Sequence, residues 1–183
     1  MIDGATQVTH LFNGMRGLHH REPGVVGAAL AMNELAVELI ADGVHVRPEL
    51  VDYVFRTKHA DKVVLITDAL SPAGNPEGFE PEDYPVAVRG GCVRMLNDDS
   101  LVGSILTMDE ALRKMVDFTG QSIGSIVHAM TMNPARQIGI DDRKGSIEPG
   151  KDADLIILDE GMNVIATFVK GNCVYSTDDN VKP

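Results

Sequence analysis

The sequence predicts an α/β protein, with strands and helices alternating over its first part, more helices following, and a small β region at its end. Apolar runs of strand length at 6–12, 35–40 and 62–67 enclose segments with helical character. Strands that alternate with helices pair in parallel through right-handed crossovers, as in an α/β barrel. From residue 153 onward the strand-like runs follow one another across glycine turns, which is typical of antiparallel pairing.

The connections in the first part have recognisable signals. A polar loop at 13–24 follows the first run, and the apolar stretch 25–32 predicts a short helix. Pro48 suits the first turn of a helix. The apolar residues after it fall on one helical face: Leu50, Val51, Val54 and Phe55.

The second part begins with a stretch rich in proline and glycine after Asp68, which predicts a loop. Runs at 84–89 and 91–96 flank a Gly-Gly pair and predict a β-hairpin. Amphipathic patterns predict helices at 108–118 and 122–132, and a short one from Asn133 to Ile138. The strands expected at the end are 153–158, 164–169 and 173–175.

Composition narrows the classes of partner. Of the 183 residues, 44% are hydrophobic and 23% charged, with a net charge of −11. This balance argues against nucleic acid and against an anionic membrane surface, although one arginine or a few backbone amides still suffice for an anionic small substrate. Cys92 and Cys173 form no CxxC motif and are expected to be buried thiols of a cytoplasmic protein. No apolar run approaches the roughly 20 residues of a membrane span.

Three polar residues stand where predicted strands end: His10, His45 and Asp68. The carboxyl ends of parallel barrel strands converge on one mouth, which predicts a shared site. A neutral imidazole binds Zn²⁺, and a carboxylate beside a metal-bound water takes up its proton. Structural alternatives stay open, with His10 a hydrogen-bonded residue and Asp68 a helix cap or loop residue.

The loop at 13–24 combines glycine, amide and arginine groups. Its backbone amides and Arg21 could hold a phosphate, and a solvated surface loop is the alternative. His19 and His20 are expected to be polar loop residues rather than metal ligands.

Several segments resemble the signature of N-acetylglucosamine-6-phosphate deacetylases. They are THLFNGM at 9–15, HREPGVVGA at 20–28, IADGVHV at 40–46, LITDA at 65–69 and GSILTM at 103–108. The tail GSIEPGKDADL at 145–155 is similar to the end of many amidohydrolase-superfamily enzymes and identifies only the superfamily.

The resemblance implies a TIM-like (β/α)8 barrel and a small β-sandwich. The chain would hold about the last three barrel strands in residues 1–140, and part of the sandwich in 141–183. It further implies a homodimer and a catalytic divalent metal, with zinc expected and iron or manganese as alternatives. The implied reaction hydrolyses N-acetylglucosamine 6-phosphate to glucosamine 6-phosphate and acetate.

The same resemblance implies individual roles. His10 would ligate the metal, and Asp68 would be the general base that activates water and then protonates the leaving amine. Asn13, the backbone of Gly14, and Arg21 would bind the phosphate, with Arg21 reaching into a neighbouring subunit's site. The residues expected to line or cover the sugar are Asp42, His45, Leu101, Val102 and Gly103.

The chain departs from the family pattern at Gly14, where alanine is usual, and at Ile105, where a small residue is usual. The family's other metal ligands, a glutamate and a second histidine, have no convincing counterpart. We therefore expect a poorly bound metal, an isolated chain that is inactive, and an open sheet edge that drives pairing. The alternatives are another amidohydrolase-superfamily activity, or a non-catalytic chain that binds a sugar phosphate or a partner.

Overall fold

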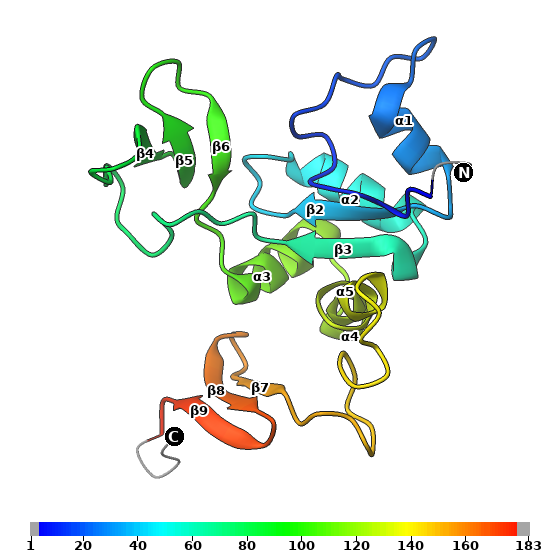
Figure 1. The fold of residues 1–183 in the computed structure, drawn as a ribbon, viewed down its shortest axis with the longest axis vertical. Coiled ribbons are helices and arrows are strands. Elements are labelled where there is room, and N and C mark those ends of the chain that lie inside the picture. Colours follow the sequence, from blue (N-terminus) through cyan, green and yellow to red (C-terminus); the bar gives the residue numbers. More distant parts are fainter. Residues whose placement is uncertain (1–3, 179–183) are drawn as a thin grey trace.

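A computed structural model describes residues 4–178, which form three small sheets with helices around the first of them (Figure 1). The parallel sheet has the order β1-β2-β3, with β1 at Gln7–Val8, β2 at Ala36–Ile40 and β3 at Val63–Ile66. Val37 of β2 pairs with both Val8 and Val63, which fixes the register across the sheet. Strand, helix and parallel strand therefore alternate as predicted.

Helices cover one face of this sheet. Helix α1 spans Gly24–Ala31, α2 spans Pro48–Thr57 and α3 spans Met108–Thr119. Alternate side chains of β2 and β3 point toward α2 and α3, where they form the main core. Its fully buried members include Val37, Leu39, Val54, Val63 and Met115.

The helix boundaries follow from local signals. Pro48 lies at the start of α2, with Glu49 in the first turn and Arg56 in the last, which suits the helix dipole. Asp109 and Glu110 lie in the first turn of α3, where their negative charges suit the dipole of that helix. Gly120 ends α3 in the left-handed conformation (φ +63°) that glycine adopts without a steric penalty.

Two antiparallel sheets complete the fold (Figure 1). The first contains β4 (Val86–Arg89), β5 (Cys92–Met95) and β6 (Leu101–Ser104). The second contains β7 (Leu155–Leu158), β8 (Val164–Val169) and β9 (Asn172–Ser176). The predicted hairpin and the predicted terminal strands are confirmed, whereas β6 was not predicted from the sequence. The expected domain boundary at residue 140 stays a prediction.

Between α3 and β7 the chain forms short helical turns. These are α4 (Ile123–Ile126), the 3-10 turn η2 (Val127–Met130) and α5 (Met132–Gln137), while a further 3-10 turn, η1 (Ala60–Lys62), precedes β3. The single helix predicted at 122–132 is thus wrong in detail, because its last turn tightens before Thr131 departs from helical geometry. No helix in residues 4–178 has the length and apolar character needed to cross a membrane.

The first strand is much shorter than the predicted 6–12. Leu11 is fully buried in the core, so its apolar character reports packing rather than strand geometry. The chain instead turns after Val8, and His10 and Phe12 have positive φ angles of 31° and 78°. The expectation of two buried thiols also needs correction, because Cys92 is buried but Cys173 is partly exposed.

Candidate functional site

The polar residues predicted to meet lie beyond the carboxyl ends of neighbouring parallel strands. His10 follows β1, Asp42 and His45 follow β2, and Asp68 follows β3. Neighbouring strands lie about 4.8 Å apart, so these ends share one edge of the sheet. The chain leaves β2 and β3 on the side of the β4–β6 sheet (Figure 1).

His10 is a half-buried residue with a strained backbone (φ +31°), and its Nδ1 is buried without a hydrogen-bond partner. Residues with side chains occupy the left-handed region only where the surroundings impose it, often at functional sites. A buried polar atom without a hydrogen-bond partner destabilises the folded protein unless a bound ion or molecule interacts with it. These observations favour a ligand role over a satisfied structural histidine.

Asp42 and His45 form a buried pair, each with 4% of its side chain exposed. The Oδ2 atom of Asp42 lies 2.6 Å from His45 Nδ1, and its Oδ1 accepts the backbone N–H groups of Val44 and His45 at 2.8 Å. Burial alone would raise the pKa of Asp42. The hydrogen bonds from the His45 side chain and the two backbone amides outweigh burial, so the pKa lies below its ordinary value.

Helix α3 holds the loop that carries this pair. Lys114 Nζ donates to the backbone oxygen of Asp42 at 3.1 Å. Gly43 has φ +78°, and a Cβ there would lie 3.1 Å from the ring of Phe118. Glycine is therefore required at this turn both by the backbone conformation and by the close approach of α3.

Asp68 is also in the left-handed region (φ +50°), and it is exposed. Strand β6 fixes its backbone, because Ser104 N donates to Asp68 O at 2.9 Å. A Cβ on Gly103 would lie 3.0 Å from that same oxygen. Leu101, Val102 and Gly103 therefore run past Asp68, in the region where they were predicted to cover a substrate.

The predicted phosphate residues are only partly brought together. The backbone N–H of Asn13 donates to His10 O at 2.9 Å, and a Cβ on Gly14 would lie 3.8 Å from His10 Cε1, so both adjoin His10. Arg21 is exposed and lies in the loop before α1, with its Nη1 2.9 Å from His20 Nε2. Within residues 4–178, Arg21 makes no hydrogen bond to the strand-end residues.

The fit to a divalent metal is partial. His10 Nδ1 offers one unpaired imidazole nitrogen, which is a suitable donor for zinc and related ions. Within the described part of the chain, no three His, Cys, Asp or Glu side chains group closely enough to hold a metal. His10 thus fits as one ligand of a set to which other residues would contribute.

Two residues beside this site were not predicted from the sequence. Glu38 lies in the middle of β2, and its carboxylate accepts hydrogen bonds from the turn that carries His10. Ser104 is fully buried, donates from Oγ to Thr67 O and accepts the N–H of Leu106 at 3.0 Å. A lone charge within the apolar strand run was the available signal for Glu38, whereas Ser104 gave none.

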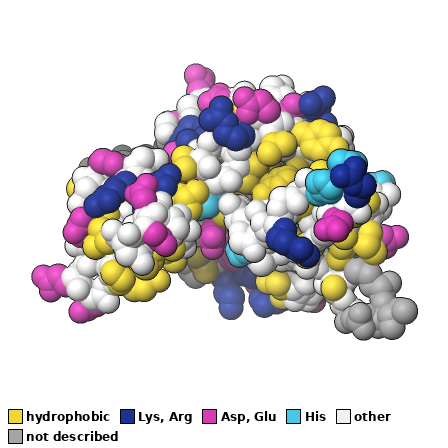
Figure 2. Space-filling model, turned by 90° about the horizontal axis from the view of Figure 1, so that it is seen from above, with side chains coloured by type: hydrophobic (Ala, Val, Ile, Leu, Met, Phe, Trp, Pro, Cys, Tyr) yellow, Lys and Arg dark blue, Asp and Glu magenta, His cyan; other side chains and the backbone are white. Residues whose placement is uncertain are grey.

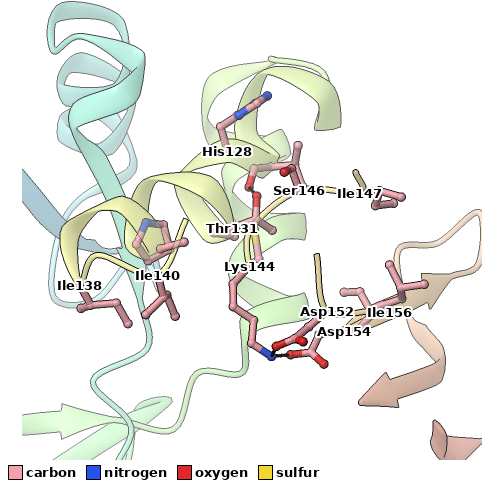
Figure 3. A pocket seen from close by; sticks show the side chains of 16 residues that line it. His128, Thr131, Ile138, Ile140, Lys144, Ser146, Ile147, Asp152, Asp154 and Ile156 are labelled. Carbon is pink, nitrogen blue, oxygen red and sulfur yellow. Dashed lines mark hydrogen bonds and ion pairs between the residues drawn. The ribbon is translucent and has the colours of Figure 1, made fainter. Parts of the chain in front are cut away.

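A separate hollow of about 610 Å³ lies between η2, α5 and the start of β7 (Figure 3). Its walls include Ile138, Ile147 and Ile156, and at one side Lys144 is paired with Asp152 and Asp154. Because Lys144 and Arg143 together offset the charges of the two aspartates and the walls are largely apolar, we assign no chemistry to this hollow.

Comparison with known proteins shows which family the chain is similar to. Residues 2–174 match the model of the amidohydrolase family. The chain is 44% identical over 173 residues to N-acetylglucosamine-6-phosphate deacetylase of Bacillus subtilis, covering 94% of this chain and 43% of the relative. It is 41% identical to N-acetylgalactosamine-6-phosphate deacetylase of Escherichia coli O157:H7, covering 92% and 44%. The chain spans less than half the length of these relatives.

Solved structures of the same family are similar to this chain as well. The crystal structure of N-acetylglucosamine-6-phosphate deacetylase from Thermotoga maritima superposes with a TM-score of 0.89 at 38% identity, covering 96% of this chain and 48% of that one. A mutant of the Mycobacterium smegmatis enzyme, solved in complex with N-acetyl-D-glucosamine-6-phosphate, gives 0.87 at 34% identity and covers 96% and 47%. The similarity therefore extends over almost all of this chain.

Proposed function

Because this chain belongs to the amidohydrolase family, we propose that it carries part of a hydrolase site that removes the acetyl group from N-acetylglucosamine 6-phosphate. The observation that carries the proposal is the convergence of His10 and Asp68 on one edge of the parallel sheet, both in left-handed backbone. In this proposal the sheet is the last part of a TIM-like barrel, and β7–β9 belong to a small β-sandwich.

The chemistry divides among the residues at the strand ends. His10 would hold a divalent metal ion, with zinc as the expected ion, and a metal bound there supplies Lewis-acid polarisation of the amide carbonyl. Asp68 would accept a proton from the attacking water and return it to the leaving amine. Its exposure in this chain leaves its carboxylate accessible to water and substrate.

The substrate would be held by the surrounding loops. The backbone near Asn13 and Gly14 and the guanidinium of Arg21 would bind the phosphate. With Asp42 accepting the proton on Nδ1, His45 Nε2 is an acceptor for a sugar hydroxyl. Residues 101–103 would cover the sugar, since they run past Asp68.

A second copy of the chain is part of the proposal. The loop that carries Arg21 contributes exposed Leu18, and His20 next to Arg21, to a hollow of about 630 Å³, whose wall also includes Tyr53 of α2. Figure 2 shows histidine and arginine side chains beside apolar ones on the face seen from above. Sedimentation velocity tests this part, with a dimer expected and a monomer at high concentration contradicting it.

The epimeric substrate is a second candidate. Relatives that share 41% and 42% identity with this chain are named for N-acetylgalactosamine 6-phosphate, and the second of them is 96% covered by the match. The two substrates differ only in the configuration at one sugar hydroxyl, which makes the hydroxyl contacts of the pocket decisive.

The test is a chimera in which this chain replaces the matched segment of the Bacillus subtilis relative. Acetate release is measured on both sugar phosphates and on unphosphorylated N-acetylglucosamine, and folding is checked by circular dichroism. We expect hydrolysis of a sugar phosphate, loss of activity in His10→Ala, and a raised KM for phosphorylated substrates alone in Arg21→Ala. A folded chimera that hydrolyses neither sugar phosphate contradicts the proposal.

A further inference from the structure

Glu38 is the one charged residue of β2, whose sequence is AVELI. Because side chains alternate along a strand, Val37 and Leu39 point into the core beneath the helices, and Glu38 points to the opposite face. A carboxylate on an otherwise apolar strand is unfavourable unless hydrogen-bond donors surround it. The donors around Glu38 therefore indicate what this residue does.

Within residues 4–178, the hydrogen-bond donors to the Glu38 carboxylate all come from the short segment around His10. Gln7 Nε2 donates to Oε1, while Thr9 Oγ1 donates to Oε2 at 2.5 Å. The backbone N–H of His10 also points at Oε2, at 3.4 Å. The backbone oxygen of Glu38 accepts the N–H of Leu11 at 2.8 Å. One residue of β2 thus holds both the end of β1 and the turn that follows.

This set of bonds coincides with the strained backbone. The pairing of β1 with β2 ends at Val8, and two residues later His10 has a φ of +31°. A residue with a side chain keeps this conformation only where its neighbours impose it. The hydrogen bonds that Glu38 accepts from residues 9–11 hold this part of the backbone against β2.

We propose that Glu38 is a positioning residue that holds the left-handed turn at His10 and so directs the imidazole, leaving Nδ1 free to bind a divalent cation. Cation binding at Nδ1 rests on the proposed function of His10, whereas the hold of Glu38 on the backbone turn does not. Glu38 acts here through His10 and is not itself assigned contact with metal or substrate.

The full chain is used for the test, with two nuclear magnetic resonance readouts. The Cα and Cβ chemical shifts of His10 report its backbone conformation, and the ring ¹⁵N shifts of His10 are followed during titration with Zn²⁺. The variants are Glu38→Leu, which removes the two carboxylate acceptors but keeps the backbone oxygen, and Thr9→Val, which removes one donor at nearly constant shape. Glu82→Leu, at an exposed position, is the matched control.

In Glu38→Leu we expect the His10 shifts to leave the left-handed range and its apparent Zn²⁺ affinity to fall about 10- to 100-fold, as for other residues that orient metal ligands. Thr9→Val should change both readouts in the same direction by less, and Glu82→Leu should change neither. If the backbone shifts of His10 are unaltered in Glu38→Leu, the role proposed for Glu38 is overturned. If Glu38→Leu fails to fold, unaltered shifts in Thr9→Val overturn it instead. Absence of any Zn²⁺ response at His10 in the unaltered chain overturns the metal role instead.

Discussion

Replacing Asp42 with asparagine should reverse the proton position on His45. The carboxylate Oδ2 lies 2.6 Å from His45 Nδ1, so in the unaltered chain Nδ1 carries a proton, and in the neutral imidazole Nε2 is the acceptor. An asparagine in the same place keeps Oδ1 for the N–H groups of Val44 and His45 but presents an amide N–H toward Nδ1. His45 Nδ1 must then accept, and the proton moves to Nε2.

The cost of this change can be worked out from the bonds. The two backbone bonds to Oδ1 remain, so only the side-chain contact changes. A hydrogen bond to a charged group contributes about 1.5–3 kcal/mol and a neutral one about 0.5–1.5 kcal/mol. The free energy of unfolding should therefore fall by about 1–2 kcal/mol, since both side chains are 4% exposed and little screened by solvent.

Urea denaturation measures the stability, and long-range ¹H–¹⁵N spectra at about pH 9 distinguish the two histidine tautomers. Asp52→Asn is the control, because its ion pair with Arg56 lies on the surface and contributes little. The folded-state pKa of Asp42 is lowered, so its stabilisation is present above the ordinary value of 3.8 and is lost as the pH falls through the folded-state pKa. An unchanged Nδ1–H tautomer in Asp42→Asn would refute this reasoning.

Three further predictions concern stability. Lys58→Met removes two 2.6 Å hydrogen bonds from the ammonium to carbonyl oxygens at the end of α1, and should cost about 1–3 kcal/mol in urea denaturation, against a much smaller effect for Lys62→Met at a partly exposed position. Gly103→Ala would put a Cβ 2.6 Å from Leu70 Cγ, so thermal unfolding should show a loss of about 1–3 kcal/mol, and an unchanged Tm would contradict the tight approach of β6. Met115→Ala empties a fully buried core position and should cost about 2–5 kcal/mol, whereas a loss below about 1 kcal/mol would mean that the core is not packed as described.

Periodicity and turn residues were sufficient to predict much of the fold. Pro48 and Gly120 lie where α2 begins and α3 ends, and the parallel order of the first three strands follows from their alternation with helices. Strand β6 was missed because its short run, LVGS, has little apolar alternation and is defined by pairing with β5. Pairing between distant segments carries no local signal.

The candidate site was predictable in its residues but not in its geometry. The strand-end positions of His10 and Asp68 could be inferred from the apolar runs before them, yet those runs also suggested that β1 continues to residue 12. The turn at His10 depends on Glu38, a tertiary partner 28 residues away. The backbone of Asp68 depends likewise on Ser104, which no pattern near Asp68 could reveal.

The most direct test of the site assignment is the kcat for acetate release by the chimera with Asp68→Asn, compared with Asp117→Asn at an exposed position of α3. If Asp68 transfers the proton, its asparagine variant should lose on the order of a hundredfold or more in kcat while retaining the fold. The Asp117 variant should remain active. Similar kcat values for the two variants would contradict the assignment of the catalytic base, and with it the strand-end site.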